Sequence, residues 1–281
     1  MRKEGPKPSK PNVHFIKAII PAAGIGSRFQ PFTLAVPKEL LTVKRKPLIQ
    51  LAVEEALAAG IHEIGIVIRE GKEAIRSHFE ALTTSSNPLW ETLRKELCRA
   101  ELRFIFQKET LGLGNAIYES GSFISDSPFV MIIPDQFILS GVPATRQLLD
   151  AASEDPQAVW SSLVTVYAEE LNLFPGARKF KLSNRISNTW EVTRIQEQSE
   201  AERGEILLGF GRTFFPAGVI DFFSEKFLNP VTEEVDLLLT FGALIKKYKN
   251  YAVLLDGKAM DFGTWKGYEY FIKYLGLSKA E

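Results

Sequence analysis

The chain is organised around one segment near its beginning: Ile16-Lys-Ala-Ile-Ile-Pro-Ala-Ala-Gly24-Ile-Gly26-Ser-Arg28-Phe-Gln-Pro-Phe-Thr-Leu-Ala-Val-Pro-Lys38-Glu-Leu40. It opens with a short apolar run that predicts a buried strand over residues 16–20. The run ends in small residues, which let a ligand lie against the backbone. Arg28 and Lys38 then add two positive charges. A strand, a glycine turn and two cations together predict a site for a polyanion, most simply a nucleoside phosphate.

Two familiar glycine motifs do not fit this segment. A dinucleotide-binding fingerprint needs a third glycine and an immediate helix, but position 29 is Phe and Pro31 opposes a helix. A P-loop needs Gly-Lys-Ser/Thr after the turn, and this sequence is missing here. Roughly 25 residues separate the strand from the next helical pattern, against the usual two to six. Long ordered loops are usually functional, so we expect this one to bind a ligand rather than to be an ordinary surface loop.

Length and composition exclude several classes of protein. The chain has 281 residues, 45% hydrophobic and 24% charged, which is typical of a globular protein with an ample core. The formal net charge is zero, which argues against broad binding to nucleic acid or to an acidic membrane. The single cysteine, Cys98, excludes an intramolecular disulfide framework. No apolar run reaches the length of a membrane span and no signal core is evident, so we expect a cytoplasmic enzyme.

Strand and helix patterns alternate through the first half. Residues 1–12 are basic and rich in proline, and they predict a disordered tail. Strand patterns at 16–20, 61–68, 101–107 and 128–135 alternate with helical patterns at 47–60, 72–82, 89–99 and 114–120. This alternation predicts an α/β fold with a doubly wound, mostly parallel, Rossmann-like sheet.

The second half is less regular. We expect strands at 158–167, 205–212 and 251–255, and helices at 145–152, 219–227, 235–247 and 265–275. Residues 180–197 predict an inserted β-hairpin with its turn at Ser183-Asn-Arg. No linker divides the chain, so we expect a single domain over residues 13–281.

Two aspartates are candidate magnesium ligands. Asp135 ends a strand pattern, at the edge of an open α/β sheet where ligands bind. Asp261 precedes the last predicted helix. Carboxylate oxygens are the donors that Mg²⁺ prefers, so the two side chains would make sense at one ion. Each also fits a plain turn or helix-capping role, which remains the alternative.

A second strand-to-helix junction repeats the design of the first loop. Gln107 follows a predicted strand, and Gly112 and Gly114 precede a helix. Backbone groups there can read a base, and the Gln107 amide can both donate and accept hydrogen bonds. A plain strand-to-helix turn is the alternative. No Gly-x-Ser-x-Gly or His-Glu-x-x-His motif occurs, so a serine hydrolase and a zinc peptidase lose support.

In this order, the pieces resemble the sugar-1-phosphate nucleotidyltransferases, and within them the bacterial UTP–glucose-1-phosphate uridylyltransferase branch. The resemblance spans about residues 16–271 and rests on Gly24-Ile-Gly26-Ser-Arg28, Pro37-Lys38-Glu39, Gly112-Leu-Gly114, Pro134-Asp135, Gly211-Arg212 and Asp261-x-Gly263. It implies transfer of a nucleotidyl group from a nucleoside triphosphate, UTP first, to a sugar 1-phosphate, glucose 1-phosphate first, with release of pyrophosphate. It also implies Mg²⁺ as cofactor and a homo-oligomer, either dimer or tetramer.

The resemblance also implies roles for residues. Arg28 would grip the triphosphate, Lys38 would neutralise charge on the reacting phosphates, and Asp135 and Asp261 would hold Mg²⁺. The nucleotide-binding half, at about 13–140, would surround the base and ribose with Ala22, Ala23, Gly24, Gly26, Gln107 and Gly112. The sugar-binding half, at about 141–281, would contact the sugar through Glu197, Gln198 and Gly211.

The sugar-binding half departs from the family pattern. Glu197-Gln198-Ser199 stands where the family has Glu-Lys-Pro, and the missing lysine would contact the sugar phosphate. A lost charge-assisted contact is worth roughly 1.5–3 kcal/mol. The candidates to replace its charge are Lys179, Lys181, Arg194 and Arg203. The family's Tyr-Gly is displaced within residues 175–180, and its Gln-Leu-Thr-Asp is replaced by Asp236-Leu-Leu-Leu239.

Three alternatives stay open on sequence alone. A thymidylyltransferase, or an enzyme for another sugar, fits the same motifs. A catalytically weak, regulatory nucleotide-binding protein is motivated by Gln198. A nicotinamide oxidoreductase is suggested by the glycine turn, although the prolines and the long loop oppose it.

Overall fold

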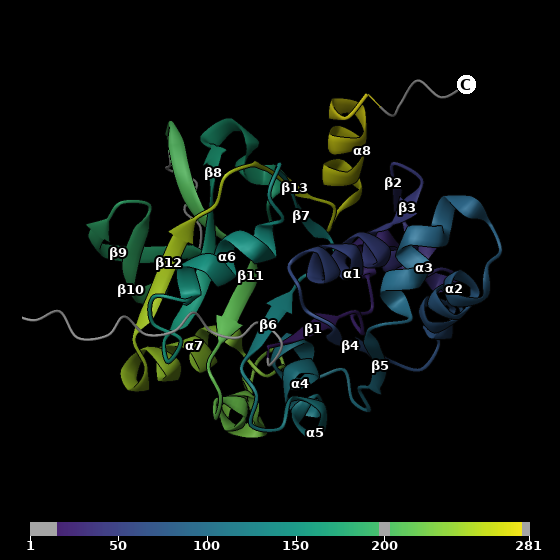
Figure 1. Cartoon of the computed structure of the whole chain (residues 1–281). Coiled ribbons are helices and arrows are strands. Elements are labelled where there is room, and N and C mark those ends of the chain that lie inside the picture. The colour runs from purple at the N-terminus through teal and green to yellow at the C-terminus, as the bar shows by residue number, and fades with distance from the viewer. Residues whose placement is uncertain (1–15, 197–202, 277–281) are drawn as a thin grey trace, which may run out of the picture.

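One sheet runs through both halves of the chain. Within residues 16–196 and 203–276, which this computed structural model describes, nine strands form it in the order β5-β4-β1-β6-β11-β8-β12-β10-β9 (Figure 1). The first-half strands are β1 (Lys17–Pro21), β4 (Glu63–Ile68), β5 (Glu101–Phe106) and β6 (Phe129–Ile132). All three pairings among these four strands are parallel. Their carboxyl ends therefore meet along one edge, where the predicted ligand loops emerge.

The second half extends the sheet with mixed pairing. Its strands are β8 (Val159–Tyr167), β9 (Lys179–Ile186), β10 (Thr189–Gln196), β11 (Glu205–Phe215) and β12 (Asn250–Leu254). β11 pairs antiparallel with both β6 and β8, and β12 pairs parallel with β8. The β9–β10 hairpin is attached through β12. The fold class expected from the sequence is confirmed.

Helices cover both faces of the sheet. The α-helices are α1 (Leu48–Ala58), α2 (Glu73–Thr84), α3 (Glu91–Leu97), α4 (Gly112–Glu119), α5 (Gly121–Ile124), α6 (Ala144–Ala152), α7 (Leu237–Lys247) and α8 (Trp265–Tyr274). Side chains alternate between two cores: Ala18 and Ile20 pack with α1, α2, α6 and α8, while Ile19 packs with α4, α5 and α7. Strands buried on both faces read as continuous apolar runs, which is why β1 and β6 were predictable.

Two local expectations were wrong. Residues 219–227 are not one helix but two 3₁₀ turns, Ile220–Phe223 and Glu225–Phe227, because Ser224 between them has extended backbone (ψ 168°). The hairpin turn lies at Ser187-Asn188, not at Ser183-Asn-Arg. Asn184 instead adopts a left-handed conformation (φ 46°) at an irregularity within β9, so the strand continues to Ile186.

Two small sheets were not expected from the sequence. β7 (Gln136–Leu139) pairs antiparallel with β13 (Lys258–Asp261), and β2 (Thr42–Val43) pairs with β3 (Lys46–Pro47). The predicted tail at 1–12 lies outside the described residues. No helix in the described ranges is long and apolar enough to cross a membrane.

Candidate active site

The glycine loop leaves the end of β1 and is fixed to its neighbours by backbone hydrogen bonds. Ala22 N–H donates to the Val67 carbonyl on β4 (2.7 Å). Gly26 has a φ of 74°, and a Cβ there would lie 2.9 Å from Thr33 Cγ2, so only glycine fits without strain. A Cβ at Gly24, in contrast, would meet no protein atom within 4 Å. The loop therefore presents bare backbone to a cavity.

A buried ion pair anchors the far end of the loop. The 3₁₀ turn Lys38–Leu40 directs Glu39 inward, where its carboxylate accepts a hydrogen bond from Lys72 Nζ (2.8 Å). Lys72 Nζ also donates to the Ala22 carbonyl (2.7 Å), which joins both ends of the loop. Burial lowers the pKa of Lys72, and Glu39 offsets only part of that effect. The loop shape thus depends on one fully enclosed pair.

Asp135 and Asp261 are brought together by the β7–β13 pair. Asp135 ends the turn after β6, and its carbonyl accepts from Phe262 N–H (2.7 Å). Asp261 is paired in register with Gln136, whose amide donates to Asp261 Oδ2 (3.2 Å). Gly263 lies between the carboxylates: a Cβ there would be 2.8 Å from Asp261 Oδ1 and 3.3 Å from Asp135 Oδ2. Neither carboxylate caps a helix, because Thr264 caps α8 by accepting from Gly267 N–H (3.1 Å).

The two carboxylates differ in protonation. Lys38 Nζ donates to Asp135 Oδ2. Burial disfavours the charged form of Asp135, but the Lys38 ammonium outweighs it and holds the pKa of Asp135 below its ordinary value. Burial, together with the adjacent Asp135 charge, raises the pKa of Asp261 to about 7. One lysine therefore neutralises one of the two acids and leaves the other short of positive charge.

A cavity of about 460 Å³ lies against the glycine loop. Arg28 and Lys38 line it on one side, and Gln107 and Gly112 on the other. The Gln107 amide donates both N–H groups inward, to the Gly112 carbonyl (3.1 Å) and to Asn115 Oδ1 (2.7 Å). Its oxygen is the atom left to accept a hydrogen bond from a ligand. We call this space the first cavity.

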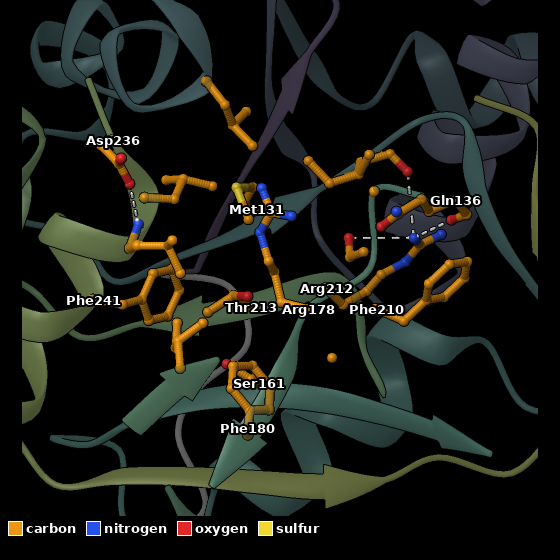
Figure 2. Close-up of a pocket in the computed structure, with 18 of the residues that line it drawn as sticks. Met131, Gln136, Ser161, Arg178, Phe180, Phe210, Arg212, Thr213, Asp236 and Phe241 are labelled. Atoms are coloured by element: carbon orange, nitrogen blue, oxygen red, sulfur yellow. Dashed lines mark hydrogen bonds between the residues drawn. The ribbon is translucent and has the colours of Figure 1, made fainter. Parts of the chain in front are cut away.

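Figure 2 shows a second cavity, of about 440 Å³. It adjoins the first, since Leu113, Ile133 and Glu234 line both. Its floor is built by β11, which is bulged between Gly209 and Thr213. Gly211 has a φ of 69°, and a Cβ there would lie 2.9 Å from Gln136 Cβ. Glycine at this position thus lets β11 approach the residue that follows Asp135.

Arg212 is a structural residue of this floor. Its guanidinium donates to both carboxylate oxygens of Glu55 on α1 (2.8 and 2.6 Å) and to the Gln136 carbonyl. Thr145 on α6 donates to the same carboxylate through N–H (3.0 Å) and hydroxyl (2.6 Å). Burial opposes ionisation of Glu55, but Arg212 outweighs it and keeps the pKa of Glu55 below its ordinary value. Each of the three guanidinium nitrogens donates within the protein, so Arg212 is committed to the fold rather than to a ligand.

The structure brings together most of the residues that the sequence singled out. The first cavity is lined by Ala23, Gly24, Gly26, Arg28, Lys38, Gln107, Gly112 and Asp135. Ala22 lies buried behind it, Asp261 borders Asp135, and Gly211 lines the second cavity. Glu197 and Gln198 lie outside the described residues.

Sequence reasoning missed three residues of the site. Lys72 and Glu55 lie in ordinary amphipathic patterns, and nothing local marks them as buried partners. Arg178, which lines the second cavity, lies in the displaced segment 175–180, where the departure from the family pattern was the available signal.

Comparison with known proteins identifies the family. The sequence profile of the nucleotidyl transferases matches residues 17–275. The chain belongs to the nucleotidyl transferase family. A UTP–glucose-1-phosphate uridylyltransferase of Bacillus subtilis, YngB, is 42% identical over 275 residues, covering 94% of this chain and 91% of that protein. The UTP–glucose-1-phosphate uridylyltransferase 2 of Staphylococcus saprophyticus is 42% identical over 151 residues, which cover 51% of this chain and 52% of that relative.

Solved structures of UDP-glucose pyrophosphorylases share the fold. A UDP-glucose pyrophosphorylase complexed with UDP-glucose matches with a TM-score of 0.80 at 26% identity, covering 94% of this chain and 99% of that one. An apo UDP-glucose pyrophosphorylase matches with a TM-score of 0.81 at 24% identity and the same coverage. The nucleotidyl transferase fold therefore extends through both halves of the chain.

Proposed function

We propose that this nucleotidyl transferase moves a uridylyl group from UTP to glucose 1-phosphate and releases pyrophosphate. A phosphate oxygen of the sugar 1-phosphate attacks the α-phosphorus of UTP. The bond from that phosphorus to the bridging oxygen breaks, and pyrophosphate departs with the electron pair. The observation that carries the proposal is the position of Lys38, Asp135 and Asp261 beside two adjoining cavities. Support for the substrates comes from the relative of matching length.

The first cavity suits a uracil nucleotide. Both amide N–H groups of Gln107 are used internally, and its oxygen accepts from no group among the described residues, which leaves that oxygen for a ligand. Uracil carries a donor at N3, whereas neutral cytosine carries an acceptor there, so this arrangement favours UTP over CTP. Gly24 leaves room for the nucleotide against the loop. Arg28, an exposed residue that lines this cavity, would hold the triphosphate.

The donor set fits a magnesium ion. Two buried carboxylates flank Gly263, and the raised pKa of Asp261 indicates a local shortage of positive charge. Within the described residues no group of three acidic, histidine or cysteine side chains is placed to hold a metal. Asp135 and Asp261 would hold the ion, and substrate oxygens and water would supply its other ligands. When bound, Mg²⁺ supplies Lewis-acid stabilisation of the phosphate oxygens.

The chain's own residues contribute position and charge. Lys38 is half-buried beside Asp135, and that carboxylate, together with Glu39, outweighs desolvation and raises the pKa of Lys38, so it remains an ammonium at neutral pH. A fixed cation in a site shielded from water stabilises negative charge on the α-phosphate more than it would in solution. Glu39 and Lys72 hold the loop that carries it. Glu197, Gln198 and Gly211 stay predictions for the sugar, as do the cytoplasmic location and the homo-oligomer.

Pyrophosphate release from a panel of substrates tests this function. The wild-type protein is incubated in Mg²⁺ with UTP, dTTP, CTP, ATP or GTP, each with glucose 1-phosphate or another sugar 1-phosphate. We expect the highest kcat/KM for UTP with glucose 1-phosphate. Asp135→Asn and Lys38→Met, each checked for folding, should lower kcat by about 10²–10³-fold. A preference for dTTP would point to a thymidylyltransferase, and folded wild-type protein that turns over no pair contradicts the proposal.

A further inference from the structure

The second cavity contains one side-chain cation with no internal partner among the described residues. Arg178 lines this cavity, and its guanidinium extends into the space toward Met131 (Figure 2). No hydrogen bond or ion pair of its side chain exists within the described ranges, and the residue is exposed to the cavity. Its backbone is fixed, because Arg178 N–H donates to the Gly209 carbonyl (3.2 Å) and its own carbonyl accepts from Gly209 N–H.

The backbone leading to Arg178 passes the acidic pair. A Cβ on Gly176, two residues earlier, would lie 3.1 Å from Gln136 Nε2 and 3.8 Å from Asp261 Oδ2. Arg178 is therefore anchored close to the carboxylates that we assign to the metal, yet its side chain enters the neighbouring cavity. An acceptor phosphate has to lie at this junction for in-line attack on a nucleotide held in the first cavity.

The other cations of this half do not serve the second cavity. Arg212 is engaged by Glu55 and by backbone carbonyls through all three of its guanidinium nitrogens. Lys179 has a partner of its own. Arg194 lines a separate groove beside α7, and neither Lys181 nor Arg203 lines the cavity. The four cations that the sequence offered as replacements for the missing lysine are therefore not positioned to neutralise an anion in the second cavity.

The remaining polar groups of the cavity suit a sugar more than a second anion. Asp236 caps α7 by accepting from Leu238 N–H (2.6 Å) and also accepts from Asn229 (2.8 Å). Arg178 contributes to the lowered pKa of Asp236, although the two groups form no ion pair. Glu234 at the border of the cavities and the hydroxyls of Thr213 and Ser161 are typical partners for sugar hydroxyls (Figure 2).

We propose that Arg178 binds the phosphate group of the sugar 1-phosphate and supplies the positive charge of the acceptor cavity. This inference rests on the proposed transfer reaction. A planar guanidinium with a fork of donors matches two phosphate oxygens, so Arg178 both neutralises and orients the acceptor. Arg178 would then take over the charge that the Gln198 position lacks.

The test compares three variants in binding and in turnover. Arg178→Met removes the charge and keeps much of the bulk, Arg178→Lys keeps the charge without the fork, and Arg194→Met is the control in the neighbouring groove. Glucose 1-phosphate binding is measured by calorimetry in the presence of a non-hydrolysable UTP analogue. We expect Arg178→Met to weaken binding about 10- to 100-fold, Arg178→Lys to recover part of it, and Arg194→Met to match wild type.

The kinetic arm separates this proposal from the transfer reaction itself. In Arg178→Met the KM for glucose 1-phosphate should rise by the same factor, while the KM for UTP and the melting temperature stay near wild type. Unchanged glucose 1-phosphate binding in a folded Arg178→Met protein overturns the proposal even if the wild type is fully active. If Arg178→Met weakens binding of glucuronic acid 1-phosphate but not of glucose 1-phosphate, the proposal is overturned too, because Arg178 would then bind a sugar carboxylate. If the wild-type protein binds both ligands but shows no turnover, the transfer reaction is contradicted. The Arg178 proposal is then decided by the binding measurement on Arg178→Met.

Discussion

Asp135 and Asp261 are two buried carboxylates beside a single lysine. Lys38 donates to Asp135, whereas the donors to Asp261 within the described part of the chain are the Gly263 N–H (2.8 Å) and the Gln136 amide (3.2 Å). Its pKa is raised to about 7 by burial and by Asp135. The folded protein therefore holds a proton that the unfolded chain releases near pH 4. By linkage, this contribution to stability is complete below pH 4 and is lost as the pH rises to about 7.

Asp261→Asn should separate stability from activity. Without Mg²⁺ at pH 8, the variant should have a larger free energy of unfolding than wild type, on the order of 1–4 kcal/mol, because it buries no second charge. At pH 4 the difference should vanish. Urea unfolding in EDTA at both pH values checks this, with Asp256→Asn on the surface as the control. Pyrophosphate release should fall strongly. A variant that is no more stable than wild type at pH 8 contradicts the assigned protonation.

The glycine loop and the β7–β13 pair are the elements that assemble the site. The loop was evident from the sequence, because an apolar strand, glycines and cations are contiguous from Ile16 to Lys38. The β7–β13 pair was not, because Gln136 and Asp261 lie 125 positions apart and each strand is only four residues long. Arg178 was missed for the same reason. Local patterns predict elements, whereas side chains that meet across the fold depend on contacts that local patterns do not encode.

Gly24→Ala should affect nucleotide binding without affecting folding. A Cβ at Gly24 meets no protein atom within 4 Å, so the melting temperature should stay close to wild type. The added methyl group would occupy the first cavity, and we expect the KM for UTP to rise about tenfold. Gly141→Ala, also in open space but outside the cavity, is the matched control. An unchanged KM for UTP in Gly24→Ala would place the nucleotide elsewhere.

The Glu55–Arg212 pair ties α1 and α6 to the floor of the second cavity. Glu55→Ala leaves the Arg212 charge buried without its partner and should cost about 3–5 kcal/mol of unfolding free energy. Glu54→Ala, on the same helix, removes a partly exposed pair with Lys46 (2.6 Å) and a hydrogen bond from Gln50 (2.7 Å), and it should cost less, about 1–2 kcal/mol. Chemical denaturation compares the two variants. Equal, small losses would show that the pair does not support the floor.

On the scale of the whole molecule, the last helix packs on the first loop. Trp265 of α8 contacts Phe29 and Phe32, with ring centroids 5.0 and 5.8 Å apart. The Tyr268 hydroxyl donates to the Thr42 carbonyl (2.8 Å). The shared sheet and this contact support the proposal that both halves form one domain.

Unfolding should accordingly be a single transition. Variants that keep only Trp90, in the first half, or only Trp160, on β8, should report the same urea midpoint by fluorescence. Far-UV circular dichroism, which reports on the secondary structure of the whole chain, should give the same urea midpoint. Separate midpoints for Trp90 and Trp160 would show that the halves unfold independently, against the single domain proposed here.

The fate of an isotope label tests the proposed reaction most directly. Wild-type protein is incubated with UTP, Mg²⁺ and glucose 1-phosphate carrying ¹⁸O in its phosphate, and the products are measured by mass spectrometry. Attack by the sugar phosphate on the α-phosphorus predicts UDP-glucose that carries all of the label, with an equal amount of unlabelled pyrophosphate. Label in the pyrophosphate, or pyrophosphate formed without UDP-glucose, would contradict the reaction assigned to this site.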